Sequence, residues 1–345
     1  MRLAAASLLL GALAGPAMAQ TPFNASELRH YPLQEVTADF AMRYVVRLGP
    51  GGRAPYFQAL AEADARLRPL LLLETMRTWL GRGDDGLHTF FFLNAGDVAP
   101  EILTALREAG LDREADLMTQ ALAVFGPVYP VDYDVRRKLF GYDSSSQLND
   151  FDRRLMAVSR RFGDRAAFAQ AIEAYVRRTP WLLERLEQHR SKVPEERRLR
   201  WLQGQLSRHV DLYGPVILMI ADFFALPADY RPILALGLFQ MEFSNGGVHQ
   251  FFYNSAGNLA PEVVAALVAL GLPRQTGLMR KALAMFASPY DRDTERRRAR
   301  YFQAGTTPWD KQLQAITYEI EAVDGEPFFG QAVLDYARMR DLLPH

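Results

Sequence analysis

The sequence predicts an all-α protein made of two tandem homologous helical domains joined by a charged helical connector. Residues 88–125 recur at residues 249–286 without a gap, and 19 of the 38 aligned positions are identical. A repeat of this length indicates a duplicated domain. Apolar residues follow helical spacing in both copies, and no stretch keeps the alternation of apolar and polar residues that is typical of strands.

The first 19 residues have the pattern of a signal peptide. Arg2 is basic, Leu3–Leu13 is apolar, and Ala17-Met18-Ala19 is an A-x-A cleavage site. Because Leu3–Leu13 is shorter than the roughly 20 residues that cross a bilayer, we expect cleavage after Ala19 and no membrane association afterwards. The protein is therefore expected to be periplasmic or secreted.

The remaining boundaries follow the repeat and the composition. We expect a leader at residues 20–55, copy one at 56–159, the charged helical connector at 160–209 and copy two at 210–345. From Asp152 to Asp211 the chain has 14 Lys or Arg and 8 Asp or Glu. We expect this excess, like the run Arg296-Arg297-Arg298, to lie on solvated helix faces with pairs four residues apart.

Each copy should contain a helix that begins at a first-turn proline and ends before a glycine in a left-handed conformation. The prolines are Pro100 and Pro261, the glycines are Gly110 and Gly271, and the expected N-caps are Asp97 and Asn258. A second helix follows, with Leu117, Met118, Ala121, Leu122 and Phe125, or Leu278, Met279, Ala282, Leu283 and Phe286, facing inward. A last helix after Pro327 should bury Ala332, Val333, Tyr336 and Met339.

Copy two carries a polar, glycine-rich segment before its first repeated helix. Asn245-Gly246-Gly247 favours a sharp turn between two helices. Gln250 and Asn254 are four residues apart and therefore share a helix face. The candidate binding residues are Glu242, Asn245, Gly246, Gly247, His249, Gln250, Asn254 and Ser255.

The string E-x-x-N-G-G-x-x-Q-F-F-x-N-S-x-G, followed by L-A-P-E and an A-L-x-x-F helix, resembles a bacterial family of small helical domains. That family is known chiefly through a DNA-mimic protein that binds a transcriptional regulator. Copy two matches the pattern over roughly 75 residues, whereas copy one departs from it at the turn. The resemblance implies a helical fold and a protein partner.

The two copies provide an internal comparison. At the constant offset of 161, Glu242 becomes Gly81 and Asn254 becomes Leu93, so copy one lacks the polar set. The set is therefore either a local turn network or a site that copy two alone uses. His249 has a counterpart in His88, which favours a packed, hydrogen-bonded core residue over a ligand.

Composition excludes several classes of function. The chain has 40 basic and 40 acidic residues, so it has neither the basic excess of a nucleic-acid binder nor the acidic excess of a DNA mimic. Cys is absent, and the six His residues lack the spacing of metal ligands. No nucleotide-binding, metalloprotease or serine-hydrolase motif is present. We expect no cofactor, no metal and no catalytic residue.

Two hypotheses remain. The first is an exported, non-catalytic protein-interaction module, with an inhibitor-like role as one form of it. The second is an enzyme or small-molecule-binding protein with a single pocket at the copy-two turn, where Glu242 would be the acid or base and the neighbouring amides would orient the substrate.

Overall fold

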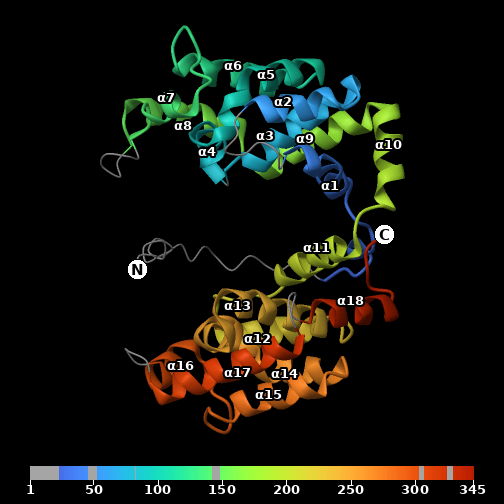
Figure 1. The fold of residues 1–345 in the computed structure, drawn as a ribbon, viewed down its shortest axis with the longest axis vertical. Helices are drawn as coiled ribbons and strands as arrows, with labels where there is room; N and C mark the ends of the chain where they lie inside the picture. Colours follow the sequence, from blue (N-terminus) through green and yellow to red (C-terminus); the bar gives the residue numbers. More distant parts are fainter. Residues whose placement is uncertain (1–22, 46–52, 82, 142–147, 303–306, 325–328) are drawn as a thin grey trace. The chain divides into compact units, whose positions relative to one another are not determined.

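The computed structural model describes residues 23–45, 53–81, 83–141, 148–302, 307–324 and 329–345 (Figure 1). Within these ranges the regular elements are helices, and the predicted all-α class is confirmed. The expected signal peptide, residues 1–19, lies outside the described residues. No helix in the described part of the chain is both long and apolar enough to cross a membrane.

The chain divides into two compact units. Among the described residues, the N-terminal unit comprises Tyr31–Pro194 and His345, and the C-terminal unit comprises Glu195–Pro344 together with residues 23–30. The division at Pro194 falls inside the range 160–209 that we expected to be a connector. Two helices of that range belong to the N-terminal unit and the third to the C-terminal unit.

The N-terminal unit is organised around α3, which contacts α1, α5 and α9. Its helices are α1 (Leu33–Val45), α2 (Arg53–Ala61), α3 (Arg68–Trp79), α4 (Gly86–Phe92), α5 (Ala99–Glu108), α6 (Asp112–Val124), α7 (Tyr133–Arg137), α8 (Asp150–Phe162), α9 (Arg165–Arg177) and α10 (Pro180–Arg190). A 3-10 turn, η4 (Asn94–Val98), joins α4 to α5.

The C-terminal unit is organised around α13, which contacts α11, α14, α17 and α18 (Figure 1). Its helices are α11 (Glu195–Ser207), α12 (Val216–Ala225), α13 (Arg231–Tyr253), α14 (Ala260–Ala269), α15 (Pro273–Leu283), α16 (Thr294–Tyr301), α17 (Pro308–Asp324) and α18 (Gly330–Met339). The turn η6 (Ser255–Leu259) corresponds to η4. Apolar side chains from all these helices form one continuous core.

Most of the predicted helix ends are confirmed. Proline lies in the first turn of α5 and of α14. Gly110 and Gly271 have φ of 62° and 68°, the left-handed conformation that glycine adopts without strain. The expectation that Asp97 and Asn258 cap these helices is wrong, because neither helix has a side-chain cap. Both side chains instead accept hydrogen bonds from a buried arginine.

The inward faces are largely as expected. Leu117, Met118 and Ala121 are buried in α6, and Met279 and Ala282 are buried in α15. In α18 the face is displaced by part of a turn. Val333, Leu334, Tyr336 and Ala337 are buried, whereas Met339, which we expected to face inward, is 74% exposed.

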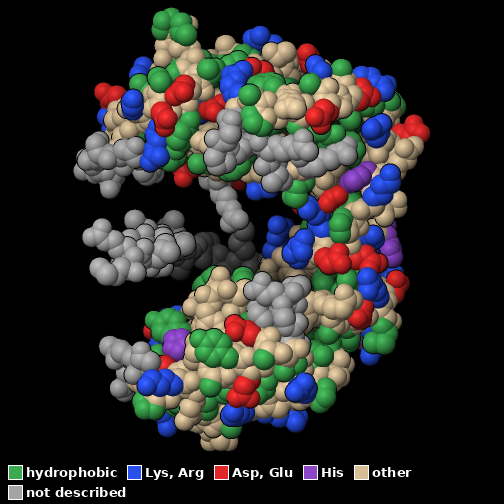
Figure 2. Space-filling view, in the orientation of Figure 1, with side chains coloured by type: hydrophobic (Ala, Val, Ile, Leu, Met, Phe, Trp, Pro, Cys, Tyr) green, Lys and Arg blue, Asp and Glu red, His purple; other side chains and the backbone are tan. Residues whose placement is uncertain are grey.

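Charged side chains of both signs are interspersed on the face drawn in Figure 2. No large field of one sign dominates that face, in agreement with the balanced charge of the sequence.

Candidate binding site on the C-terminal unit

The Asn-Gly-Gly segment forms a kink in α13, as the sequence predicted. Gly246 has φ −175° and ψ 27°, and Gly247 has φ 69° and ψ −159°, so the helical pattern is interrupted there. A Cβ at Gly247 would lie 2.5 Å from Cγ2 of Thr317. The next amide, that of Val248, donates to Oγ1 of Thr317 at 3.0 Å. The kink is therefore held directly against α17.

The N-terminal unit makes the same contact with different residues. The amide of Leu87 donates to Oγ of Ser159 on α8 at 2.9 Å. A Cβ at Gly86 would lie 2.5 Å from the carbonyl oxygen of Gly163. Because both copies pack a glycine and an amide against a hydroxyl-bearing helix, this contact supports the fold.

His249 and His88 also have matching partners. Nε2 of His249 lies 3.1 Å from Oδ1 of Asp310, and Nε2 of His88 lies 2.9 Å from Oδ1 of Asp152. Each Asp is in the first turn of its helix and accepts backbone amide hydrogen bonds there. Each His also meets a phenylalanine ring edge-on. The shared arrangement indicates a structural role for His249.

These contacts affect the two aspartates in the same way. Burial alone would raise the pKa of Asp310, but hydrogen bonds from Thr307 and the proximity of His249 hold that pKa below its ordinary value. Burial would likewise raise the pKa of Asp152. Hydrogen bonds from His88 and from nearby backbone amides outweigh this effect, so the pKa of Asp152 is lowered as well. Both carboxylates therefore favour the ionised form that the fold uses.

Three predicted residues line a cavity of about 420 Å³. Glu242 on α13 is only 9% exposed, and its Oε2 accepts a hydrogen bond from Nδ2 of Asn254 at 2.7 Å. Asn254 and Ser255, at the start of η6, form part of the wall. The other walls come from the loop before α12 and from the first turn of α16.

The remaining candidates lie elsewhere. Asn245 and Gly246 are exposed at the kink, Gly247 is buried there, and His249 and Gln250 are half-buried. None of these five residues lines the cavity. The structure thus divides the polar set into a kink, a contact with α17, and a cavity wall.

The helices before the turn have a different offset from the helices after it. Arg68-Pro69 opens α3 and Arg231-Pro232 opens α13, so these helices are related by 163 residues, whereas the segment from His88 onward is related by 161. In the helical register the counterpart of Glu242 is therefore Trp79, and not Gly81.

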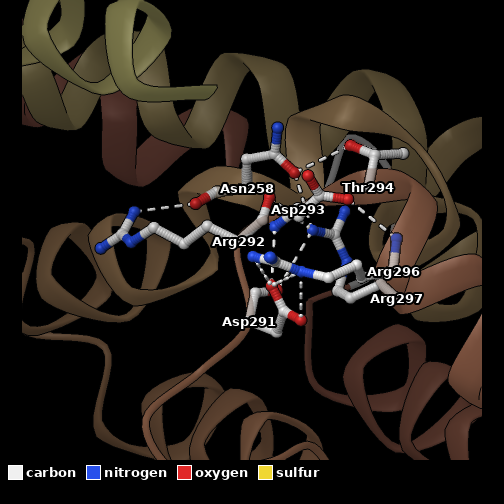
Figure 3. A network of polar contacts seen from close by, with 7 residues as sticks. All are labelled: Asn258, Asp291, Arg292, Asp293, Thr294, Arg296 and Arg297. Carbon is white, nitrogen blue, oxygen red and sulfur yellow. Dashed lines mark hydrogen bonds and ion pairs between the residues drawn. The ribbon is translucent and has the colours of Figure 1, made fainter. Parts of the chain in front are cut away.

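Sequence reasoning missed a buried arginine in each unit. Arg136 and Arg297 are 0% exposed, although we expected the run that contains Arg297 to be solvated. Figure 3 shows the Arg297 guanidinium directed at Asn258 and at the backbone around Asp291 and Arg292. Its Nε also donates to the carbonyl oxygen of Phe252 at 3.0 Å. Burial lowers the pKa of Arg297. The signal in the sequence was an arginine kept at the same repeat position.

The two buried guanidinium groups differ in the charge of the side chain that accepts their hydrogen bond. Arg136 forms an ion pair with Asp97 at 2.8 Å, whereas Arg297 meets the neutral amide oxygen of Asn258 at 2.7 Å. Burial raises the pKa of Asp97, although Arg136 acts in the opposite direction. Arg292 binds Glu262 through two hydrogen bonds of 2.7 Å, and in the N-terminal unit Arg53 from α2 binds the corresponding glutamate.

An apolar helix face was also missed. Ile217, Leu218 and Phe224 of α12 are 72%, 52% and 48% exposed, and Tyr213 in the preceding loop is 93% exposed. The corresponding helix α2, at the offset of 163, has Ala54, Pro55 and Ala61 at these three positions. The inward positions of the two helices are buried alike. Tyr56 and Met219 are fully buried, and Leu60 and Phe223 are almost fully buried. Only the outward face differs.

Comparison with known proteins agrees with this duplicated architecture. A family model described as DMP19-like protein matches residues 62–179 and 224–340. A search of the curated proteins found no match, and a search of the solved structures found none either. Because the two matched regions cover more than half of the chain, it belongs to the DMP19-like protein family and carries two tandem regions of that family.

Proposed function

We propose that this protein is a non-catalytic interaction module that binds a protein partner through the exposed face of α12. The observation that carries the proposal is the group of large apolar side chains on that face, namely Tyr213, Ile217, Leu218 and Phe224. Contiguous exposed apolar residues of this kind mark interaction sites on soluble domains. Covering one such side chain contributes roughly 1.5–3 kcal/mol.

The comparison between the units supports this choice of surface. The α2 face has small residues where α12 has Ile217, Leu218 and Phe224, while the inward faces of both helices are buried alike. Large outward residues are thus not needed to fold this helix against its neighbours. Their presence in one unit alone favours a role in binding.

The charge around α12 indicates the chemistry of the partner. From His209 to Tyr230 the chain has three Asp and neither Lys nor Arg, and the next residue, Arg231, places its guanidinium over the Phe224 ring at 5.3 Å. A partner segment that combines apolar residues with a basic residue would complement this surface. The family resemblance supports a protein partner, and the balanced charge of the chain separates this mode of binding from DNA mimicry.

We also propose that the protein is exported. The proposal rests on the pattern of residues 1–19, with cleavage after Ala19. N-terminal sequencing of the protein purified from its native cells would test it. Gln20 as the first residue supports export, and an intact Met1 in the purified protein contradicts it.

The experiment for the interaction module is capture of a partner from native extract by the tagged full chain. Ile217→Ser/Phe224→Ser should abolish capture, because it removes two apolar contacts without changing charge. The matched control is Tyr318→Ser/Met339→Ser, which alters two exposed apolar residues of α17 and α18. Equal capture by both double variants, or no specific partner of the wild type, contradicts the proposal.

The cavity supports a second candidate function, a small-molecule-binding protein or enzyme, because Glu242, Asn254 and Ser255 line it together. Glu242 would act as the acid or base and Asn254 would orient the ligand. A compound that raises the melting temperature of the wild type but not of Asn254→Ala would support this candidate. A broad screen in which no compound does so would eliminate it.

A further inference from the structure

We infer that the cavity beside α12 binds the ammonium or guanidinium group of a lysine or arginine side chain that the partner presents. The inference rests on the proposed function, because it assigns the basic part of the same partner segment to a particular site. It concerns the cavity of about 420 Å³ in the C-terminal unit.

The cavity is continuous with the apolar face. Pro215 and Val216, at the beginning of α12, form part of the cavity wall. The next residue, Ile217, belongs to the exposed face and is 72% exposed. Tyr213, at 93% exposed, borders both. A segment that covers α12 therefore lies beside residues of the cavity wall and can extend one long side chain towards the cavity.

Glu242 is the central feature of the cavity. It is 9% exposed, and the only hydrogen bond to its carboxylate from a described residue comes from Asn254, at Oε2. No Lys, Arg or His among the described residues forms an ion pair with it. A buried carboxylate is stabilised by a cation and is costly without one. The second oxygen, Oε1, is thus available to a cation that enters from outside.

Arg298 is the one cationic residue that the described part of the chain contributes to the cavity wall, and it has other partners. Arg298 donates to the carbonyl oxygen of Tyr253 at 2.9 Å and to Glu295 at 2.9 Å, and it stacks on the Tyr253 ring. Asp293, which also lines the cavity, uses one oxygen to cap α16. The described residues of the cavity wall thus contribute three carboxylates, those of Glu242, Asp293 and Glu295, against one guanidinium that already has partners, and this imbalance favours a positively charged occupant.

The shape suits a long basic side chain. Leu212 and Val216 are half-buried and offer apolar wall against which the methylene groups of lysine or arginine would pack, whereas Glu242 is more deeply buried. In the N-terminal unit the corresponding positions carry Trp79 in place of Glu242 and Arg53 in place of Val216. The acceptor is consequently a property of the C-terminal unit.

A titration of the full chain with N-acetyl-lysine N-methylamide, followed by NMR, tests the inference. Its neutral control is N-acetyl-norleucine N-methylamide, and acetate is the anionic control. We expect the lysine probe to bind at least tenfold more tightly than the norleucine probe. Glu242→Gln should weaken the lysine probe about tenfold, because it removes the charge but keeps an oxygen for Asn254. Glu321→Gln, an exposed residue of α17, should have no effect.

Equal binding of the lysine and norleucine probes, preferential binding of acetate, or full lysine binding by Glu242→Gln would each overturn the inference. Partner capture separates this result from the fate of the proposed function. Capture that survives Glu242→Gln but not Ile217→Ser/Phe224→Ser keeps the interaction module and rejects the cation site. Charge-dependent lysine binding without any captured partner supports the cation site, with free amines as its source, and rejects the module. Thermal melting of Glu242→Gln verifies that the variant is folded.

Discussion

Arg136 and Arg297 are the largest of the fully buried side chains in the described part of the chain. A guanidinium offers five N–H donors in a fixed plane, and each of these arginines binds the carbonyl groups that end one helix and begin the next turn. The Arg297 guanidinium donates hydrogen bonds to three backbone carbonyl oxygens, those of Phe252, Asn254 and Arg292. It thus joins η6 to the first turn of α16.

Arg297→Ala should destabilise the protein by about 3 kcal/mol or more, because several buried carbonyl groups would lose their donor at once. Arg296→Ala, one residue away and 73% exposed in its side chain, should cost under about 1 kcal/mol. Urea unfolding of the two variants measures the difference. Similar midpoints for both would contradict the role assigned to Arg297.

The pair of His249 and Asp310 leads to a prediction on pH. The fold holds the pKa of Asp310 below its ordinary value of 3.8, so the stability that this carboxylate contributes is present above that value and is lost as the pH falls below it. The melting temperature of the wild type should therefore decline from pH 5 to pH 3 more steeply than that of Asp310→Asn. Parallel curves for the two proteins would refute this assignment.

The kink in α13 determines where the polar segment lies. Gly247 combines a positive φ with a close approach to Thr317, so two independent constraints require glycine there. The helix after the kink then carries His249 towards α17, while Asn254 and Ser255 reach the cavity. The kink at Gly246 and Gly247 thus places residues that are close in sequence in two different environments.

Gly247→Ala should therefore destabilise the protein by about 2 kcal/mol or more. Gly277→Ala, in the interior of α15, should stabilise it by about 0.5–1 kcal/mol, because no atom lies within 4 Å of the added Cβ and alanine favours the helix. Thermal melting of both variants gives the comparison. The opposite signs are the prediction, and a loss of stability in both would contradict it.

The sequence was sufficient for the helices that have strong local signals. Proline at the first turn and glycine at the left-handed end bracket α5 and α14, and apolar spacing identifies the buried faces of α6 and α15. It was not sufficient for Arg297, since burial of a charged residue depends on carbonyl groups 45 positions away. Nor did it reveal the cavity, because Glu242 and Asp293 meet only through the packing of α13 and α16.

The two compact units do not follow the chain in simple order. Residues 23–30 belong to the C-terminal unit, where Leu28 is 6% exposed and the Phe23 ring meets Tyr230 edge-on at 5.3 Å. The final residue, His345, belongs to the N-terminal unit and accepts a hydrogen bond from the amide of Tyr31 at 2.9 Å. Residues 23–30 and His345 therefore each join the unit that lies farther away in sequence, which the repeat does not predict.

Leu28→Ala should destabilise the C-terminal unit by about 2–3 kcal/mol, although it lies far from that unit in sequence. Hydrogen exchange followed by mass spectrometry localises the effect. We expect faster exchange in α13, where Tyr230 adjoins the first turn, and unchanged exchange in α3. Faster exchange confined to α3 would mean that residues 23–30 support the other unit instead.

The membership of residues 23–30 in the C-terminal unit has a consequence for synthesis. Phe23 and Leu28 are among the first residues of the described chain to leave the ribosome, while their partners around Tyr230 are made some 200 residues later. These apolar side chains must wait, uncovered, until most of the polypeptide has been translated. A ribosome that stalls after Pro194 would release a chain whose N-terminal apolar residues are exposed and prone to aggregation. Chaperones that bind exposed apolar segments are the factors that would recognise such a chain.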